Sequence, residues 1–111
     1  MITVETQGAV TVLTPDVPLN AEAAEPLLAA LHAPASPGLP QVVLDLSGVA
    51  IIDSAGLEAV LDARAEVRGR GGVIKLAGAR PLVADILVAT GVGDTFEMLG
   101  STKAAVGSFS R

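Results

Sequence analysis

The chain has 111 residues, enough for one domain with its own hydrophobic core but not for two. Seven basic and twelve acidic residues give a net charge of −5, which argues against nucleic acid as a partner because binding phosphates needs clustered Lys and Arg. With no cysteine and one histidine, disulfides, thiol nucleophiles and multi-histidine metal centres are excluded, and we expect no metal site.

The mean hydropathy is high, at +0.60, but the sequence predicts no membrane insertion. The most apolar stretches, residues 42–52 and 82–92, are short and are interrupted by Asp45 and Asp85, whereas a spanning helix needs about 20 mostly apolar residues. The first residues show no signal-peptide pattern, and the lack of cysteine agrees with a reducing compartment. We therefore expect a cytoplasmic protein, and a monomer or weak dimer because nothing in the composition requires a dimer.

The first elements along the chain are predicted to form a β-hairpin. Residues 2–6 alternate apolar and polar side chains, as a half-buried strand does, and residues 9–14 form a second β-rich run. The turn signal at Gly8 joins them, so we expect two antiparallel strands. Pro15 and Pro18 are expected to end the pairing, because proline cannot donate a backbone hydrogen bond.

A helix is predicted over residues 21–32, which are rich in Ala and Leu and follow a good N-cap residue, Asn20. Pro26 lies inside this pattern and is tolerated only near a helix start, so the helix begins later than residue 21 or bends at the proline. Residues 33–40 contain several prolines and are predicted to form a loop.

Strands and helices then alternate to the end of the chain. Residues 41–46 are a nearly continuous apolar run, typical of a strand covered on both faces, and Asp45 is expected at its end, where it reaches solvent or backbone N–H groups. Residues 49–52 are expected to return to the interior. The later elements are a helix at 55–68 stopped by the glycines of 69–72, a buried strand at 73–77, a helix from Pro81 to a stop at Gly91, a short strand at 96–99, and a helix capped by Ser101 that reaches about residue 107.

This order, ββαβαβαβα, predicts an α/β fold in a single domain over residues 1–111. Alternating strands and helices require parallel pairing with right-handed crossovers, and the opening hairpin adds one antiparallel pair. We therefore expect a mixed, mostly parallel sheet of about five strands with about four helices.

The first candidate functional residue is Ser54, in the sequence Asp53-Ser54-Ala55-Gly56, where an apolar run gives way to a helix. One interpretation is that its hydroxyl caps backbone N–H groups, which stabilises a helix by about 1 kcal/mol. The other is that it accepts a phosphoryl group, which would meet unpaired N–H groups and the positive end of the helix dipole. Ala55 and Gly56 are small, so a kinase could approach the hydroxyl closely.

An acidic stripe follows Ser54 along the predicted helix. Ser54, Glu58, Asp62 and Glu66 are spaced by four residues and therefore fall on one face. This face is either simply solvated, with Glu66 and Arg70 as its one compensating pair, or it binds a partner. In the second case a phosphate, which adds about −1.5 to −2 charges beside Asp53 and Glu58, would repel an acidic or tightly docked partner surface and release it.

Catalysis by Ser54 is disfavoured, and we expect no catalytic residue. A nucleophilic serine needs a positioned base and an oxyanion hole, but the single histidine, His32, ends a predicted helix beside a proline-rich loop. Ile52 also stands in place of the first glycine of a G-x-S-x-G elbow. The glycines at 69–72 and 91–93 follow helices, unlike those of a phosphate-binding loop.

The chain resembles a STAS domain over essentially its whole length. The likeness is strongest at Asp53-Ser54-Ala55-Gly56-Leu57, preceded by Val43-Leu44-Asp45-Leu46-Ser47-Gly48-Val49. Further matches are Gly71-Gly72 before the strand at 73–77, Pro81, the stop at Thr90-Gly91-Val92, and Phe96. Bacterial anti-anti-sigma factors, or anti-sigma factor antagonists, are the best-known members of this family.

The resemblance implies a regulatory protein rather than an enzyme. In that family a partner anti-sigma factor, itself a serine kinase, phosphorylates the serine after the aspartate; this assigns the acceptor role to Ser54 and a supporting role to Asp53. The unphosphorylated form binds the anti-sigma factor and frees the sigma factor for transcription, and a serine phosphatase restores it. The kinase carries the nucleotide, so no cofactor is expected. The implied partner-binding residues are Asp53, Ser54, Ala55, Gly56, Glu58, Asp62 and Asn20.

The chain departs from the family pattern at three places. Where members commonly have Gly-x-Leu-Asp after the second strand, this chain has Val17-Pro18-Leu19-Asn20, and Glu58 replaces a frequently small residue. STAS domains also serve as stand-alone partners of lipid-transport ABC complexes and as parts of stressosome-like assemblies. The departures at Val17 and Asn20 favour this alternative, in which the helix starting at Ser54 docks constitutively.

Overall fold

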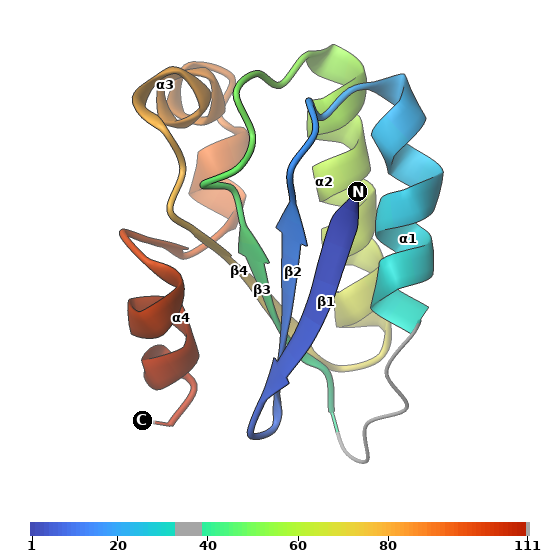
Figure 1. The fold of residues 1–111 in the computed structure, drawn as a ribbon, viewed down its shortest axis with the longest axis vertical. Coiled ribbons are helices and arrows are strands. Elements are labelled where there is room, and N and C mark those ends of the chain that lie inside the picture. Colours follow the sequence, from blue (N-terminus) through green and yellow to red (C-terminus); the bar gives the residue numbers. More distant parts are fainter. Residues whose placement is uncertain (33–38, 111) are drawn as a thin grey trace.

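The computed structural model describes residues 1–32 and 39–110, so most of the predicted loop at 33–40 lies outside the described residues. The order of strands and α-helices is ββαβαβαβα, as predicted, with two short 3-10 segments added (Figure 1). The elements are β1 (Ile2–Gln7), β2 (Val10–Pro15), η1 (Ala21–Ala23), α1 (Ala24–His32), β3 (Gln41–Asp45), α2 (Ser54–Gly69), β4 (Val73–Ala77), α3 (Pro81–Ala89), η2 (Val92–Thr95), β5 (Met98–Leu99) and α4 (Thr102–Ser108).

The strands of the described residues form one mixed sheet in the order β1-β2-β3-β4-β5. β1 and β2 make the predicted antiparallel hairpin, with Gly8 at a φ of 62° in its turn, and the remaining neighbours pair in parallel. The carboxyl ends of β2, β3 and β4 therefore meet at one end of the sheet, the upper end in Figure 1. The segments that follow these strands lie together there.

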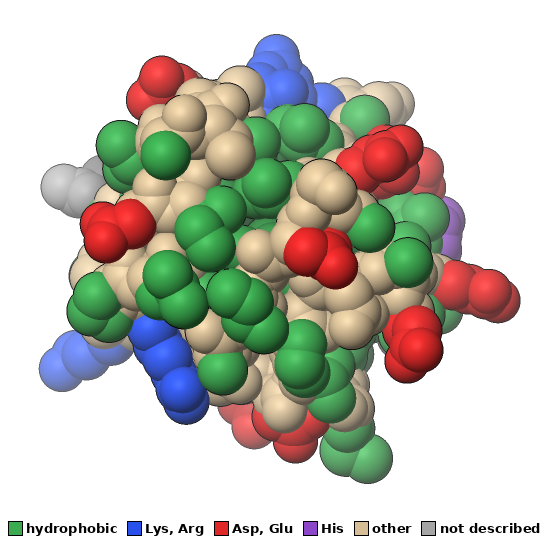
Figure 2. Space-filling model, turned by 90° about the horizontal axis from the view of Figure 1, so that it is seen from above, with side chains coloured by type: hydrophobic (Ala, Val, Ile, Leu, Met, Phe, Trp, Pro, Cys, Tyr) green, Lys and Arg blue, Asp and Glu red, His purple; other side chains and the backbone are tan. Residues whose placement is uncertain are grey.

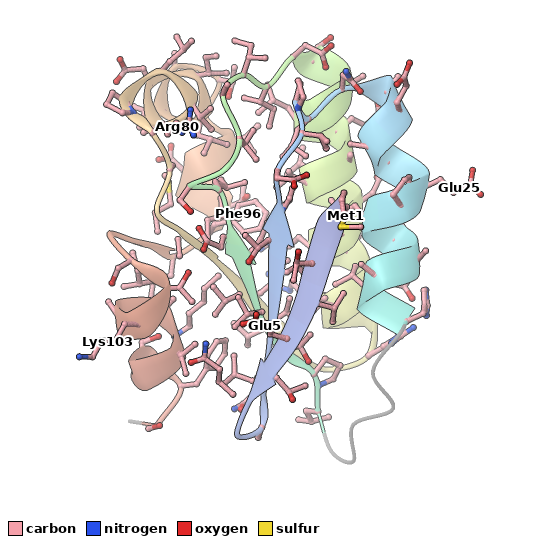
Figure 3. All side chains as sticks on the ribbon, in the orientation of Figure 1. Met1, Glu5, Glu25, Arg80, Phe96 and Lys103 are labelled. Carbon is pink, nitrogen blue, oxygen red and sulfur yellow. The ribbon has the colours of Figure 1, made fainter. Side chains whose placement is uncertain are left out.

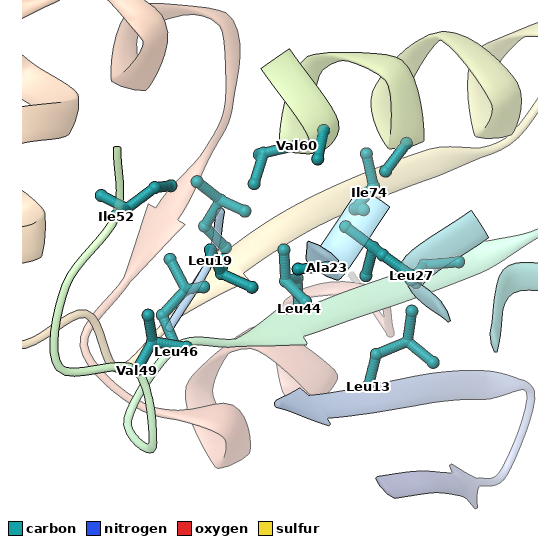
Figure 4. Close-up of a cluster of buried hydrophobic side chains, with 14 of the residues drawn as sticks. Leu13, Leu19, Ala23, Leu27, Leu44, Leu46, Val49, Ile52, Val60 and Ile74 are labelled. Atoms are coloured by element: carbon teal, nitrogen blue, oxygen red, sulfur yellow. The ribbon is translucent and has the colours of Figure 1, made fainter. Parts of the chain in front are cut away.

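Helices cover both faces of this sheet (Figure 1). Successive side chains of β3 point to opposite faces, so Leu44 packs into a large aliphatic cluster under α1 and α2, while Val43 packs into a smaller one under α4. Figure 4 shows Leu44 in the large cluster with Leu13, Leu27 and Val60. Aliphatic side chains thus form the core of a chain that has only two aromatic residues.

Two prolines shift element boundaries in physically simple ways. The 3-10 turn of η1 precedes α1, so α1 begins at Ala24 and Pro26 falls in its first turn, where no intrahelical N–H is needed. This confirms that the helix starts later than residue 21. Pro15 is the last residue of β2 rather than a residue beyond it. It is accommodated because β2 pairs with β3 only as far as Leu13 and Leu44.

The edge formed by β5 is shorter than predicted. β5 contains only Met98 and Leu99, which pair with Leu76 and Ala77 of β4. Val73, predicted to be buried, is therefore exposed, because no described strand continues along the edge beside it.

Among the described residues, no helix combines the length and the apolar character that crossing a bilayer requires.

Candidate functional site

The candidate site lies where the chain leaves β3 and enters α2. Leu46, Val49 and Ile52 are buried in the main cluster and anchor the connecting segment. The expectation that residues 49–52 return to the interior is therefore met at Val49 and Ile52 only. Ile51 between them is exposed, as is Asp53. The anchored residues thus fix the path of the chain and leave its other side chains at the surface.

A second segment, the one between β2 and η1, is hydrogen-bonded to this connection. Leu19 forms a parallel bridge with Ile52: its N–H donates to the Ile51 carbonyl at 3.1 Å, and its carbonyl accepts from the Asp53 N–H at 3.1 Å. Gly56 is buried against the same carbonyl, and a Cβ at this position would overlap it. The glycine is therefore needed for the close approach of the two segments.

Asp53, rather than Ser54, caps α2. Its Oδ1 accepts a hydrogen bond from the Gly56 N–H at 2.9 Å, and its extended backbone is typical of an N-cap. Ser54 is the first residue of the helix and is exposed, and no hydrogen bond joins its hydroxyl to the part of the chain that the structure describes. The interpretation that Ser54 caps the helix is therefore wrong, because Asp53 is the capping residue.

Asn20 lies at the same end of the sheet, directly after the bridged Leu19. Its Oδ1 accepts from the Glu22 N–H at 3.0 Å, so it caps η1 as predicted, and it is half-buried. The structure therefore brings the segment of Asn20 next to the amino end of α2. Ala55 is half-buried in that first turn, whereas Glu58 is exposed one turn further on.

The acidic stripe on α2 divides into two parts. Glu66 lies 3.0 Å from an Arg70 nitrogen and 3.2 Å from Nε2 of His32, so the predicted compensating pair is present and includes the histidine. Glu58 and Asp62 are exposed and form no ion pair with the described residues. The end of the stripe near Ser54 is the part that carries uncompensated negative charge.

His32 lies too far from Ser54 to act as its base. It ends α1 and contacts Arg70 and Glu66, and Glu66 is twelve residues beyond Ser54 on α2. At about 1.5 Å of rise per residue the separation is about 18 Å along the helix axis. This arrangement agrees with the prediction that His32 is a surface residue at a helix end.

The segments described above all lie at the end of the sheet where the parallel strands finish, and they form one face of the molecule. Figure 2 shows hydrophobic side chains across the middle of this face, with acidic side chains spaced around them and Lys or Arg side chains at the upper and lower-left edges. Arg80, labelled near α3 in Figure 3, donates from Nε to the Ser47 carbonyl at 2.8 Å and so ties the start of α3 to the connection after β3. Asp45 lies at the end of β3 as predicted, and its Oδ1 accepts from the Ser47 N–H at 2.9 Å.

A polar cluster that the sequence did not reveal lies under α4, on the face of the sheet opposite to α1 and α2. Lys75 of β4 is buried, with its Nζ 2.6 Å from Ser108 Oγ, 3.0 Å from Glu97 Oε2 and 4.3 Å from the centre of the Phe109 ring. The Ser108 hydroxyl is also buried and donates to the Ala105 carbonyl at 2.7 Å. These contacts hold α4 on the sheet. A lysine inside the apolar run 73–77 was the only available signal.

The sequence matches the family model of the STAS domain over residues 1–106. No curated protein matches it. Among solved structures, a STAS domain protein from Planctomyces limnophilus described as an anti-sigma-factor antagonist is 21% identical, with a TM-score of 0.84, covering 99% of this chain and 98% of that one. The anti-sigma factor antagonist SpoIIAA in its unphosphorylated form is 19% identical, with a TM-score of 0.78, covering 99% and 96%. A sulfate transporter family protein from Wolinella succinogenes is 17% identical, with a TM-score of 0.80, covering 94% and 87%.

The fold is that of a small α/β domain with an exposed serine at the start of α2. The chain belongs to the STAS domain family. The structural likenesses, at about 20% identity, extend to both anti-sigma factor antagonists and transporter domains and concern the fold.

Proposed function

We propose that this protein is an anti-sigma factor antagonist whose binding to a serine-kinase anti-sigma factor is switched by phosphorylation of Ser54. The observation that carries the proposal is the state of the Ser54 hydroxyl. It is exposed at the first position of α2, and Asp53 already caps the helix, so modification leaves the cap intact. In this proposal the domain is not an enzyme, needs no cofactor and acts on transcription through protein partners only.

Phosphorylation changes the charge and hydration of one point on the surface. The γ-phosphoryl group of ATP, held by the kinase, forms a bond to Ser54 Oγ as its bond to ADP breaks, and a base of the kinase takes the hydroxyl proton. The product carries about −1.5 to −2 charges next to Asp53 and one turn before Glu58. An interface that covers Ser54 would have to desolvate this group, so the partner dissociates without refolding of the domain.

The proposed contact surface consists of the residues around that point. Asp53, Ala55, Glu58 and Asp62 extend it along α2, Gly56 holds the neighbouring segment close, and that segment adds Asn20. Glu58 and Asp62 are the exposed carboxylates that form no ion pair among residues 1–32 and 39–110, so they remain available to a partner. A serine phosphatase would return the protein to its binding form.

Mass spectrometry after incubation with each anti-sigma-type kinase of the same genome and ATP tests the acceptor role. We expect one phosphate, on Ser54, and none in Ser54→Ala. Ser47→Ala is the matched control, because Ser47 is another exposed serine at this end of the sheet, and its loss should leave the phosphate in place. Phosphate absent from Ser54 in the presence of an active kinase would overturn the proposal.

A binding measurement tests the release step. Ser54→Asp should weaken the kinase complex by more than Ser54→Ala, since only the first adds a charged group that the interface must desolvate. Equal affinities of the two variants would remove this argument.

The alternative function, a constitutive adapter in a lipid-transport ABC complex or a stressosome-like assembly, is favoured by one observation. Asn20 lacks the carboxylate usual for the family, and its amide oxygen is used to cap η1. Co-purification separates the two functions: an ATPase–permease partner indicates the adapter, and a kinase with the histidine-kinase fold indicates the switch.

A further inference from the structure

The outward face of α3 is unusual for a surface helix. Its exposed residues are Pro81, Leu82, Asp85, Val88 and Ala89, and only Asp85 carries a charge. Leu82 is 53% exposed and Val88 is 68% exposed, although Val83 and Leu87 already supply the contacts to the core. A surface helix normally places polar side chains on this side. The packing of this domain therefore does not account for the apolar residues.

A further exposed apolar side chain lies near Ser54 in the sequence. Ile51, 43% exposed, lies three residues before the serine, and the Arg80–Ser47 hydrogen bond ties its segment to the start of α3. Figure 2 shows that hydrophobic side chains are numerous on this end of the molecule. Contiguous exposed apolar surface marks an interaction site more often than single apolar residues do.

We propose that the outward face of α3, with Ile51, is a docking surface for a partner protein that presents apolar side chains bordered by Lys or Arg. The proposal rests on the proposed function, because it describes the face of the anti-sigma factor that meets this domain. The charges around the apolar group favour a basic border: three exposed carboxylates, Asp53, Glu58 and Asp85, outnumber the nearby cation Arg80, which keeps its charge while donating to the Ser47 carbonyl.

A second copy of the chain fits this surface less well. Each copy has a net charge of −5, and pairing two such faces would bring their carboxylates, Asp85 among them, near one another. Like charges across an interface oppose association, while complementary charges increase the association rate and the specificity. Three cavities among the described residues, with volumes of about 60, 330 and 260 Å³, are lined by residues other than those of α3 and Ile51, so none of them places a small molecule on this face.

The proposed surface also changes how the switch works. A basic border attracts a phosphate at Ser54, so long-range repulsion cannot be the cause of release. Release instead follows from the cost of desolvating the phosphate at the edge of an apolar contact. Salt should therefore weaken the unphosphorylated complex, by screening the basic border, without relieving the penalty of the phosphate.

Calorimetric titration of the kinase that modifies Ser54 tests the surface. The variant Leu82→Ser with Val88→Ser removes the apolar side chains from the face of α3. The matched control is Leu39→Ser with Val73→Ser, two similarly exposed aliphatic residues away from this end of the sheet. We expect the first pair to weaken binding at least about ten-fold, and the control pair to change it less than about two-fold. Equal affinity of the α3 variant and the unmodified protein overturns the proposal.

A kinase-independent measurement separates failure of this proposal from failure of the proposed function. The probe is an amphipathic peptide of alternating Leu and Lys blocks, with a version carrying Glu in place of Lys as its control, followed by amide chemical shifts. We expect the Lys peptide to shift α3 and Ile51 and the Glu peptide to leave them unchanged. Shifts confined to Glu58 and Asp62, or self-association that the Leu82→Ser/Val88→Ser variant abolishes, would contradict the assignment. If the Lys peptide shifts α3 but no kinase phosphorylates Ser54, the docking surface is supported and the proposed phosphorylation switch is rejected.

Discussion

On one face of the sheet, α1 and α2 bury a broad cluster of aliphatic side chains, whereas on the other face the short helix α4 covers only a small one. The second face is supplemented by a polar cluster near the carboxyl end of α4, made by Lys75, Glu97 and Ser108. The comparison teaches that apolar burial holds the half that carries Ser54, while polar contacts hold a helix that buries little.

The difference matters for the proposed function, because a switch of that kind needs a fixed scaffold. The connection that presents Ser54 is anchored by Leu46, Val49 and Ile52, all members of the large cluster. In the proposed complex the partner would meet a surface that is ordered before binding, which reduces the entropic cost of association.

The largest expected effect compares two neighbouring residues of β3. Leu44→Ala removes three carbons from the large cluster and should lower the free energy of unfolding by about 3 kcal/mol, since the packed surroundings cannot close the cavity. Val43→Ala removes two carbons on the α4 face and should cost about 1.5 kcal/mol, close to the transfer free energy alone. Both side chains are fully buried, so exposure does not explain the difference.

Urea denaturation of the two variants measures the losses. The informative quantity is the loss per carbon removed, which should be greater at Leu44 than at Val43. A loss per carbon that is equal or greater at Val43 would show that α4 packs as tightly as α1 and α2 do.

The next effect compares two helical glycines. Gly56→Ala places a Cβ against the Leu19 carbonyl and the Ile52 side chain, and it should cost about 2 kcal/mol through overpacking. Gly107→Ala, in α4, adds a Cβ where no atom lies within 4 Å, and it should stabilise by about 0.7 kcal/mol because Ala is the better helix former. Thermal unfolding would show opposite shifts, and a shift of the same sign for both would contradict this picture of the two sides.

Much of the fold could be predicted because the relevant signals are local. The alternation in residues 2–6, the continuous apolar run at 41–46 and the stop at Gly91 each specify an element within a few residues. These signals, taken in order, already imply the ββαβαβαβα arrangement and its parallel crossovers. The boundary of α2 was harder, since Asp53 and Ser54 are both good N-cap residues and only the backbone geometry identifies Asp53.

The remaining features depend on contacts between distant parts of the chain. Lys75 and Ser108 are 33 residues apart, and nothing near either residue indicates their 2.6 Å contact. Ile51 follows the same local pattern as its buried neighbours, yet it points outward because Val49 and Ile52 occupy the core. The sequence located Ser54 at the start of α2 and the acidic residues along it, and the acceptor role of Ser54 stays a prediction, whereas the apolar surface of α3 required the observed burial.

A third, smaller effect probes the polar contacts of α4. Lys75→Met keeps the apolar stem of the lysine and removes Nζ with its contacts to Ser108 and Glu97. We expect a loss of about 1 kcal/mol, because the lost interactions are partly offset by the relief of burying a charge. The exchange rate of the backbone amides should increase more in α4 than in α2. Lys103→Met, an exposed lysine of the same helix, is the control, and equal exchange in the two variants would argue against a clamp.

The smallest effect is a pH dependence at the other end of α4. Burial raises the pKa of Asp45, but hydrogen bonding to its ionised form, chiefly by Ser47, outweighs burial in total, so the net pKa lies below the ordinary 3.8. A carboxyl group with a lowered pKa stabilises the fold at pH values above its unfolded-state pKa, and this stabilisation is lost as the pH falls through the folded-state pKa. The stability difference between the unmodified protein and Asp45→Asn should therefore be constant at neutral pH and shrink below about pH 3.8. Asp62→Asn removes the same charge from the exposed face of α2, so a matching acid profile in that variant would show a general charge effect rather than a contact specific to the α4 side.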